Sequence, residues 1–444
     1  MKKSGKRILS FTMAAVMAVG CLAGCSSEDS STASGGTSGK STGITLTFGS
    51  HQSGLPTSGI VQKLAAEFEK ESGIKIDFQI SPDAQWRDLL KVKEQSGEVP
   101  DIFCADTTNS LESAINPEKY CADLSDQSWV SRIDKDVLPS VSLKNKVYGI
   151  TFPGKKMYFY IYNKEIFKKC GIANVPTTYQ ELKDACAKIK TKMPDVTPIY
   201  EATTDGWHQV LPVAENSGVY LKEDANLFTE LNANKKKLTD IPQMKTILNQ
   251  MKECASLGYF GKDYMSNATA DAKEAMAKGK AAMYIAEAAF RDEIKADYPN
   301  CKTNFGIFVQ PWGDNQVIGV NPASNAYFIS KDSKNADAAK KFFDFLARPE
   351  NLKKRLAGQP GISEVCWPEI KGKYTDEDQK YIKSHKTAKV LQIGANYVDV
   401  QFMDIGKDIE SMYTGAMTPD DVIKSAEKRR QQQAQLQKDP AFTS

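Results

Sequence analysis

The hydrophobic pattern after residue 43 predicts alternating strands and helices. Alternating or continuous apolar side chains predict strands at 44–48, 74–80 and 101–105. Apolar side chains at helical spacing predict helices at 60–72 and 84–96, and a glycine follows each helix as a stop signal. Strands and helices that alternate in this order predict a parallel sheet with right-handed crossovers, so the predicted fold class is α/β.

The rest of the chain continues this alternation. Residues from about 180 to 300 are predicted to be mainly helical, and the polar, Gln-rich tail at 427–437 is predicted to be a surface helix. Further extended stretches or strands are predicted at 147–153, 158–162, 281–285 and 325–330, and a further helix at 335–346. The sequence contains no internal repeat.

Polar side chains stand at the carboxyl ends of the predicted parallel strands, where such sheets bind ligands. His51 and Gln52 follow the first strand, and Asp106 ends the third. We expect these three residues to contact a ligand. The alternative for His51 is a structural role, which is usual for a single histidine, and the alternative for Asp106 is capping of a following helix.

Length and charge narrow the range of functions. A chain of 444 residues is too long for one core and suits two domains. The net charge of +3 arises within residues 1–43, which hold five basic and two acidic side chains, so the remainder is neutral overall. A neutral body argues against nucleic acid as a partner, because nucleic acid requires a basic surface. It favours a ligand that is uncharged or weakly charged.

The N-terminus has the pattern of an export signal. Basic residues precede the apolar run 8–18, which is shorter than the roughly 20 residues of a membrane-spanning helix. The segment 22–25 (Leu-Ala-Gly-Cys) resembles a bacterial lipobox. This resemblance implies that residues 1–24 are removed and that Cys25 is lipidated, as by palmitate, which anchors the protein on the extracellular face of the cell membrane. The alternatives are a signal cut elsewhere or a short anchor helix.

Residues 25–43 are rich in Ser, Gly and Thr, which predicts a flexible tether. The cysteines beyond Cys25 predict neither a metal site nor a redox motif. No Cys-x-x-Cys occurs and the chain has three histidines, so we expect no metal and no cofactor. Seven cysteines cannot all pair, and we expect them to be buried as small hydrophobic side chains. These are Cys104, Cys121, Cys170, Cys186, Cys254, Cys301 and Cys366.

Several short segments occur in an order typical of one protein family. They are 99–103 (Val-Pro-Asp-Ile-Phe), 147–153, 160–164, 279–283 (Gly-Lys-Ala-Ala-Met), and 326–331 followed by 342–350. Each segment is a weak signal, but their order and spacing span nearly the whole chain after the tether. In these segments the chain resembles the bacterial extracellular solute-binding proteins of ABC importers, especially the carbohydrate-binding branch.

The resemblance implies a fold of two α/β lobes with a ligand cleft between them. One lobe would comprise residues 44–150 and about 315–358, and the other would comprise residues 151–314 and about 359–444. Closure around a ligand would be a hinge motion, for which residues 150–152 are the leading candidate.

The resemblance also implies a function. The protein would be a lipid-anchored monomer that captures a carbohydrate, in particular an oligosaccharide, and delivers it unaltered to the transmembrane subunits of an ABC importer. The C–H faces of a sugar stack on aromatic rings, and its hydroxyl groups need polar partners. We therefore expect ligand contacts from Tyr158, Trp207 and Glu287, with ordinary packing as the alternative for Trp207. Further expected contacts are Trp312, Asn321, Asn396, Tyr397 and Gln401.

Two features leave the function open. Trp312 suits core or hinge packing as well as ligand contact. Many carbohydrate binders carry Gly followed by Trp near the strand end at residue 287, whereas this chain has Glu287-Ala288-Ala289-Phe290, so the ligand could be an unusual sugar or no sugar. The alternatives are a secreted glycoside hydrolase, which would need two flanking carboxylates, and a surface sensing or adhesion module. The usual hydrolase, metalloprotease and phosphate-loop motifs are absent.

Overall fold

A computed structural model describes residues 43–56, 58–107, 111 and 115–443. The predicted signal segment, Cys25 and the predicted tether as far as residue 42 lie outside the described residues. No helix within the described ranges combines the length and the apolar character needed to cross a membrane.

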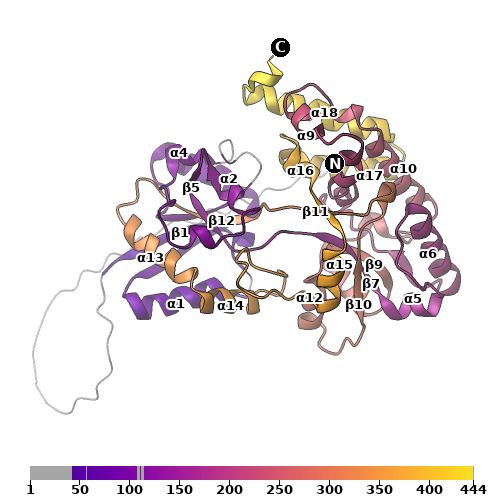
Figure 1. Ribbon diagram of the computed structural model, residues 1–444, viewed down its shortest axis with the longest axis horizontal. Coiled ribbons are helices and arrows are strands. Elements are labelled where there is room, and N and C mark those ends of the chain that lie inside the picture. Colours follow the sequence, from indigo (N-terminus) through magenta and orange to yellow (C-terminus); the bar gives the residue numbers. More distant parts are fainter. Residues whose placement is uncertain (1–42, 57, 108–110, 112–114, 444) are drawn as a thin grey trace, which may run out of the picture. The chain divides into compact units, whose positions relative to one another are not determined.

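The first sheet is mixed and has five strands (Figure 1). In spatial order they are β2 (Lys75–Ser81), β1 (Thr45–His51), β3 (Ile102–Asp106), β12 (Asn325–Ile329) and β6 (Gly149–Thr151). Strand β1 pairs in parallel with both β2 and β3, which confirms the predicted parallel arrangement of the first three strands. Strand β12 runs antiparallel between β3 and β6, so a distant part of the sequence completes this sheet.

The helices of this sheet begin and end close to the predicted residues. Helix α1 (Ile60–Ser72) and helix α2 (Asp83–Ser96) form the two crossovers. Gly73 and Gly97 end them with φ angles of 72° and 74°, a conformation that glycine adopts without steric cost. Helices α13 (Ala336–Leu346) and α14 (Pro349–Ala357) pack on α1, where Phe68 contacts two phenylalanines of α13.

The second sheet has four strands. In spatial order they are β10 (Phe305–Phe308), β7 (Tyr158–Asn163), β9 (Ala281–Glu287) and β8 (Thr197–Ile199). Side chains of β7 alternate between two hydrophobic cores, because Tyr160 belongs to one core while Phe159 and Ile161 belong to the other. The strand is therefore buried on both faces, as its continuous apolar sequence requires.

Helices and short strands surround these two sheets. The helices not yet named are α4 (Pro117–Tyr120), α5 (Lys164–Cys170), α6 (Tyr179–Lys192), α7 (Leu211–Ala214), α8 (Ser217–Glu223), α9 (Leu227–Asn232), α10 (Pro242–Ser256), α11 (Thr269–Ala277), α12 (Phe290–Asp297), α15 (Asp376–Lys383), α16 (Leu391–Gly394), α17 (Phe402–Tyr413) and α18 (Pro419–Leu436). Strand β4 (Ser142–Leu143) pairs with β5 (Lys146–Val147), and β11 (Val317–Val320) pairs with β13 (Lys386–Lys389).

Each sheet has its own hydrophobic core, and both sheets belong to one compact unit. The lobe boundaries and the hinge at residues 150–152 therefore stay predictions. One observation bears on the boundary near residue 358. Ile362, Val365 and Trp367 pack into the core of the first sheet, although the prediction assigned them to the other lobe.

The polar tail is helical and largely exposed, as its composition predicts, but one face of it is buried. It forms the second half of α18, in which Glu427 and Arg430 are buried. The Arg430 guanidinium donates to Glu427 and to the carbonyl oxygens of Leu231 and Asn396. Buried partners replace water here, which the composition of the helix alone does not reveal.

The prediction of buried, unpaired cysteines is confirmed for six of the seven. All seven are free, and only Cys301 is partly exposed.

Candidate functional site

Three segments of chain lie side by side where the polypeptide passes between the two sheets. Residues 152–157 connect β6 of the first sheet to β7 of the second. The backbones of Lys156 and Asn321 exchange two hydrogen bonds of 2.9 and 3.0 Å, and the Gly154 N–H donates to the Glu364 carbonyl at 2.9 Å. These bonds hold together three segments that are distant in sequence. Side chains near both sheets project from these segments.

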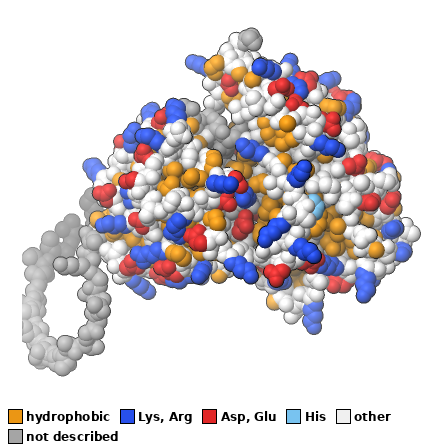
Figure 2. Space-filling model, viewed as in Figure 1, with side chains coloured by type: hydrophobic (Ala, Val, Ile, Leu, Met, Phe, Trp, Pro, Cys, Tyr) orange, Lys and Arg blue, Asp and Glu red, His pale blue; other side chains and the backbone are white. Residues whose placement is uncertain are grey.

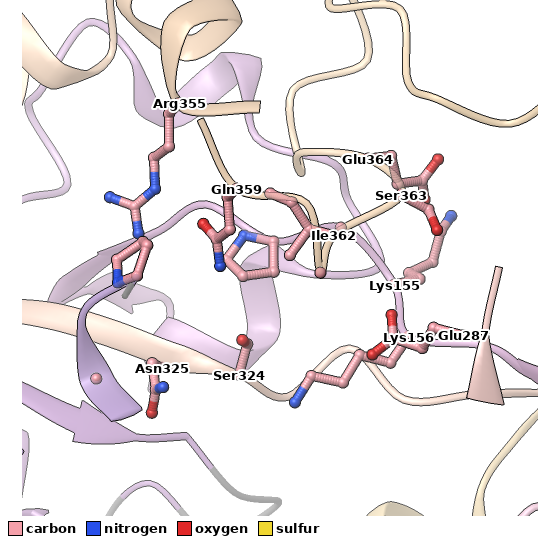
Figure 3. Close-up of a pocket in the computed structure, with 15 residues that line it drawn as sticks. Lys155, Lys156, Glu287, Ser324, Asn325, Arg355, Gln359, Ile362, Ser363 and Glu364 are labelled. Carbon is pink, nitrogen blue, oxygen red and sulfur yellow. The ribbon is translucent and has the colours of Figure 1, made fainter. Parts of the chain in front are cut away.

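A small cavity, here called the polar hollow, is built on this framework (Figure 3). Its volume is 190 Å³, and its lining combines the turn after β1, the connection 153–156, the end of β9, the start of β12 and the segment after α14. The hydrogen-bonding and charged residues in the lining are Lys155, Lys156, Glu287, Ser324, Asn325, Arg355, Gln359, Ser363 and Glu364. Because both sheets contribute, a molecule bound here would touch both.

A second cavity, here called the aromatic hollow, has a volume of 340 Å³ and shares Glu287 and Gly361 with the polar hollow. Its aromatic lining consists of Tyr158, Trp207, Tyr284 and Phe290. The rings of Tyr158 and Trp207 lie 6.4 Å apart, centre to centre, with their planes tilted by 59°. The two hollows thus meet at Glu287, with rings on one side and polar groups on the other.

Buried packing supports the aromatic wall from behind. The His208 ring stacks on Tyr284 at 4.6 Å with the planes 3° apart, and its Nε2 lies 2.9 Å from the carbonyl oxygen of Ile285. Burial lowers the pKa of His208 to about 4, so the ring is neutral at physiological pH. His208 is therefore a supporting residue and not a proton donor to a ligand.

A third cavity, here called the lateral hollow, has a volume of 770 Å³ and shares Gly154, Lys155 and Glu364 with the polar hollow. Lys155 is held at this boundary by Asp134 and Asp136, each 3.2 Å from its Nζ. The three hollows form a series along the region between the sheets. Acidic and basic side chains are interspersed over the face shown in Figure 2, in keeping with the neutral overall charge.

The carboxyl groups of the polar hollow are perturbed by their surroundings. Burial raises the pKa of Glu287 to about 7, an effect that nearby Lys156 opposes and that Glu293 and Glu364 reinforce. Burial also raises the pKa of Glu364, while Lys155 opposes the shift. The charge in this hollow therefore depends on pH close to neutrality.

The structure brings together only part of the predicted ligand set. Tyr158, Trp207 and Glu287 line the aromatic hollow, and Glu287 also lines the polar hollow. Asp106 is exposed at the end of β3, opposite Asn325, which lines the polar hollow. Gln52 is exposed beside the buried His51, whose Nε2 lies 3.8 Å from the Cys104 sulfur.

Trp312 lies in the second sheet's core rather than in a hollow. It is 1% exposed and stacks on Tyr179 at 5.8 Å. Asn321 has a structural role, since its side-chain oxygen accepts from the Ala323 N–H at 2.9 Å. Its backbone bonds with Lys156 hold the connection between the sheets.

The remaining three predicted contacts belong to the network around the C-terminal helix. The backbone carbonyl oxygen of Asn396 accepts a hydrogen bond from Arg430, and the Tyr397 hydroxyl donates to Asp439. Gln401 accepts from Arg429 and donates to the Tyr397 carbonyl oxygen. These contacts satisfy buried polar groups and do not line any of the three hollows.

The sequence reasoning missed Lys156, Arg355 and Gln359. A Pro-Gly-Lys-Lys sequence between two strands could have drawn attention to Lys156 as a polar group at a crossover. Nothing in the sequence distinguishes Arg355 from the other basic residues of its amphipathic helix. Among the described residues, no cluster of His, Cys, Asp and Glu is arranged to hold a metal ion.

Comparison with known proteins finds similarity to binding proteins of one bacterial family. The family model described as "Bacterial extracellular solute-binding protein" matches residues 54–353. The melibiose/raffinose/stachyose-binding protein MelE of Bacillus subtilis is 28% identical over 326 residues, which cover 70% of this chain and 71% of MelE. A binding protein of Brucella abortus is 24% identical over 383 residues, which cover 83% of this chain and 88% of that protein.

Solved structures agree on the fold. A sugar transporter from Bacillus licheniformis in complex with stachyose matches with a TM-score of 0.69 at 22% identity, over 87% of this chain and 99% of that structure. The likeness shows the predicted fold class, the two-lobe α/β fold of solute-binding proteins.

Proposed function

Because the chain belongs to the bacterial extracellular solute-binding protein family, we propose that it captures a carbohydrate outside the cell and delivers it to an ABC importer. The observation that carries this proposal is the junction of the aromatic and polar hollows at Glu287. Tyr158 and Trp207 offer stacking surfaces beside groups that donate and accept hydrogen bonds. A sugar needs both kinds of surface at once.

The series of three hollows supports an oligosaccharide as the ligand. Each hollow shares lining residues with the next, so a ligand of several rings can extend from Trp207 past Glu287 to Lys155. The names of MelE and of the stachyose complex, both of which refer to oligosaccharides, support the same choice.

We also propose a lipid anchor at Cys25 and a monomeric protein that meets the transmembrane subunits of an importer at the membrane. The support for the anchor is the lipobox-like segment 22–25 in the sequence. Labelled palmitate is expected to be incorporated into the protein in growing cells of a lipoprotein-forming host. Cys25→Ala is expected to abolish the label and to release the protein from the membrane fraction, and retention of the label would contradict the anchor.

Isothermal titration calorimetry against a panel of neutral and acidic oligosaccharides tests the sugar-binding proposal. The expected result is saturable binding with no change in the sugar. Chromatography of the recovered sugar separates this from the hydrolase alternative, because Glu287 and Glu364 are a carboxyl pair in one hollow and such a pair is what hydrolysis would need. Binding of no sugar, or release of shorter products, would contradict the proposal.

A further inference from the structure

Arg355 is a buried cation with unused hydrogen-bond donors at the wall of the polar hollow. It lies in the last turn of α14 and is 4% exposed. Its guanidinium carbon lies 3.8 Å from the centre of the Phe152 ring and 5.3 Å from that of Tyr327. Its Nη2 donates to the Tyr327 hydroxyl at 3.0 Å, whereas Nε and Nη1 have no partner among the described residues.

The other arginines with described side chains differ from Arg355 in this respect. Each of them forms an ion pair with a carboxylate, on the surface or in the interior. They are Arg132, Arg291, Arg348, Arg429 and Arg430. No described carboxylate lies within ion-pair distance of Arg355. Since buried charges in proteins are normally paired, the open donors of Arg355 point to a partner that comes from outside the chain.

A second cation, Lys156, lines the same hollow. Lys156 lies on the connection between the sheets, and it forms no ion pair within 4 Å among the described residues. Figure 3 shows the Arg355 guanidinium and the Lys156 amine on opposite sides of the hollow, with Ser324 and Gln359 between them. The buried Gln359 Oε1 also has no partner among the described residues.

We propose that the carbohydrate carries an acidic group, a carboxylate or a phosphate, which binds to Arg355 in the polar hollow with Lys156 on its other side. This inference rests on the proposed function, because it names the chemical class of the carbohydrate. Nε and Nη1 lie on different edges of the guanidinium, so each is a separate open donor, and such a donor forms a stronger hydrogen bond with a charged oxygen than with a neutral one. The aromatic rings behind Arg355 hold the guanidinium plane in place.

The neutral overall charge of the chain does not oppose this inference. Neutrality is a sum over the whole surface, whereas a bound group responds to the charges within a few ångströms. The carboxyl groups of Glu287 and Glu364 line the same hollow but form no ion pair with Arg355 or Lys156. Burial raises the pKa of each, which reduces the negative charge they present to an acidic ligand.

Matched ligand pairs test the inference by calorimetry on the purified protein. Trigalacturonate carries ionised carboxyl groups, whereas its fully methyl-esterified form carries neutral esters on the same sugar chain, and hexose 6-phosphates paired with the free hexoses test phosphate. We expect the charged member of one pair to bind at least about tenfold more tightly than the neutral member. The pair that shows this preference identifies the source of the acidic group.

The Arg355→Met variant tests the assigned residue. It is expected to lower the affinity for the charged ligand at least about tenfold and to change the affinity for its neutral partner by less than about threefold. Lys354→Met is the matched control, because Lys354 is the neighbouring cation on α14 and pairs with Glu67 on the surface at 2.6 Å. If Arg355→Met does not fold, Lys156→Met provides the test, with an expected loss of about threefold or more for the charged ligand alone.

Equal binding of charged and neutral partners, or unchanged charged-ligand affinity in a folded Arg355→Met variant, overturns the inference. In that case, binding of neutral oligosaccharides would leave the proposed function in place. If neither class of saccharide binds, the proposed function fails and the inference fails with it.

Discussion

Tyr158 and Glu287 face each other directly across the antiparallel pair of β7 and β9. Tyr158 is the first residue of its strand and Glu287 the last of its own, so both stand at the end of the ladder. Opposed residues in a sheet point to the same face. The register of two buried strands therefore places a ring beside a carboxyl group, and Trp207 completes the arrangement 6.4 Å from Tyr158.

Trp207→Ala is expected to weaken carbohydrate binding at least about tenfold, which corresponds to roughly 1.4 kcal/mol. The reason is the loss of the largest ring in the aromatic hollow and of its stacking surface. Calorimetric titration of the variant with the best ligand of the wild-type protein measures the loss.

The matched control for Trp207 is Tyr120→Ala. Tyr120 is a partly buried aromatic residue at the end of α4 that lines none of the three hollows. This variant should retain wild-type affinity. Wild-type affinity in a Trp207→Ala protein with an unchanged circular dichroism spectrum would remove Trp207 from the binding site.

Glu287 predicts a pH dependence of binding for an acidic saccharide. Burial raises its pKa to about 7, so the side chain is mostly neutral at pH 6 and mostly ionised at pH 8. An ionised Glu287 repels an anionic ligand, and the affinity should therefore fall roughly threefold or more as the pH rises from 6 to 8. Titrations at both pH values measure this change.

Two comparisons assign that pH dependence to Glu287. Glu287→Gln should bind the acidic ligand with nearly the same affinity at pH 6 and pH 8, because the amide does not ionise. The methyl-esterified ligand should show a smaller pH effect than the acid. A pH dependence that persists in Glu287→Gln would show that another group titrates.

The strands and helices around the first sheet could be predicted because their side chains alternate between core and solvent. Periodicity records which face is buried, and in α1 the residues that repeat at helical spacing, such as Leu64 and Phe68, are those that pack against the sheet. The position of β12 in this sheet does not follow from local pattern. It depends on a pairing between residues more than 200 positions apart.

Part of the candidate site could be predicted from polar residues at the ends of strands. Glu287 ends a strand, so its place at an edge of the sheet could be expected. Arg355 lies on an amphipathic helix beside Lys353 and Lys354, and its burial against Phe152 and Tyr327 distinguishes it from them. Trp312, between Pro311 and Gly313, has the sequence of a loop, yet its ring is buried against Tyr179. Such burial is a property of the tertiary fold.

The buried carboxyl group of Glu201 leads us to predict that the stability of the protein depends on pH. This carboxyl group is 2% exposed and accepts a hydrogen bond from the Tyr413 hydroxyl at 2.9 Å. Burial raises its pKa to about 8, although the bond from Tyr413 opposes the shift. The folded state therefore holds a proton that the unfolded chain loses at lower pH. The stability contributed by the protonated form is complete below the unfolded pKa and is lost as the pH rises toward 8.

Glu201→Gln should flatten this dependence, because the amide keeps the acceptor for Tyr413 and cannot ionise. Between about pH 5 and 8 the slope of the unfolding free energy should change by up to about 1.4 kcal/mol per pH unit. Urea denaturation at pH 5.5, 7 and 8.5 measures it. The prediction fails if wild type and variant keep a constant difference in stability across that range.

The burial of Arg430 leads us to predict that the C-terminal helix α18 contributes to the stability of the fold. Its side chain is fully buried, and it donates to Glu427, to the carbonyl oxygen of Leu231 and to that of Asn396. Arg430→Met removes all of these donors and leaves Glu427 in the interior without its cation. The expected cost is about 3 kcal/mol or more of unfolding free energy.

Lys428→Met is the control for Arg430, because it removes a cation two residues away on the exposed side of α18. Its unfolding free energy should lie within about 0.5 kcal/mol of wild type. Urea denaturation at pH 7 compares the two variants directly. If every side chain of this helix were exposed to solvent, Arg430→Met and Lys428→Met would have the same small effect. Equal unfolding free energies of the two variants would therefore contradict the buried ion pair of Arg430 and Glu427.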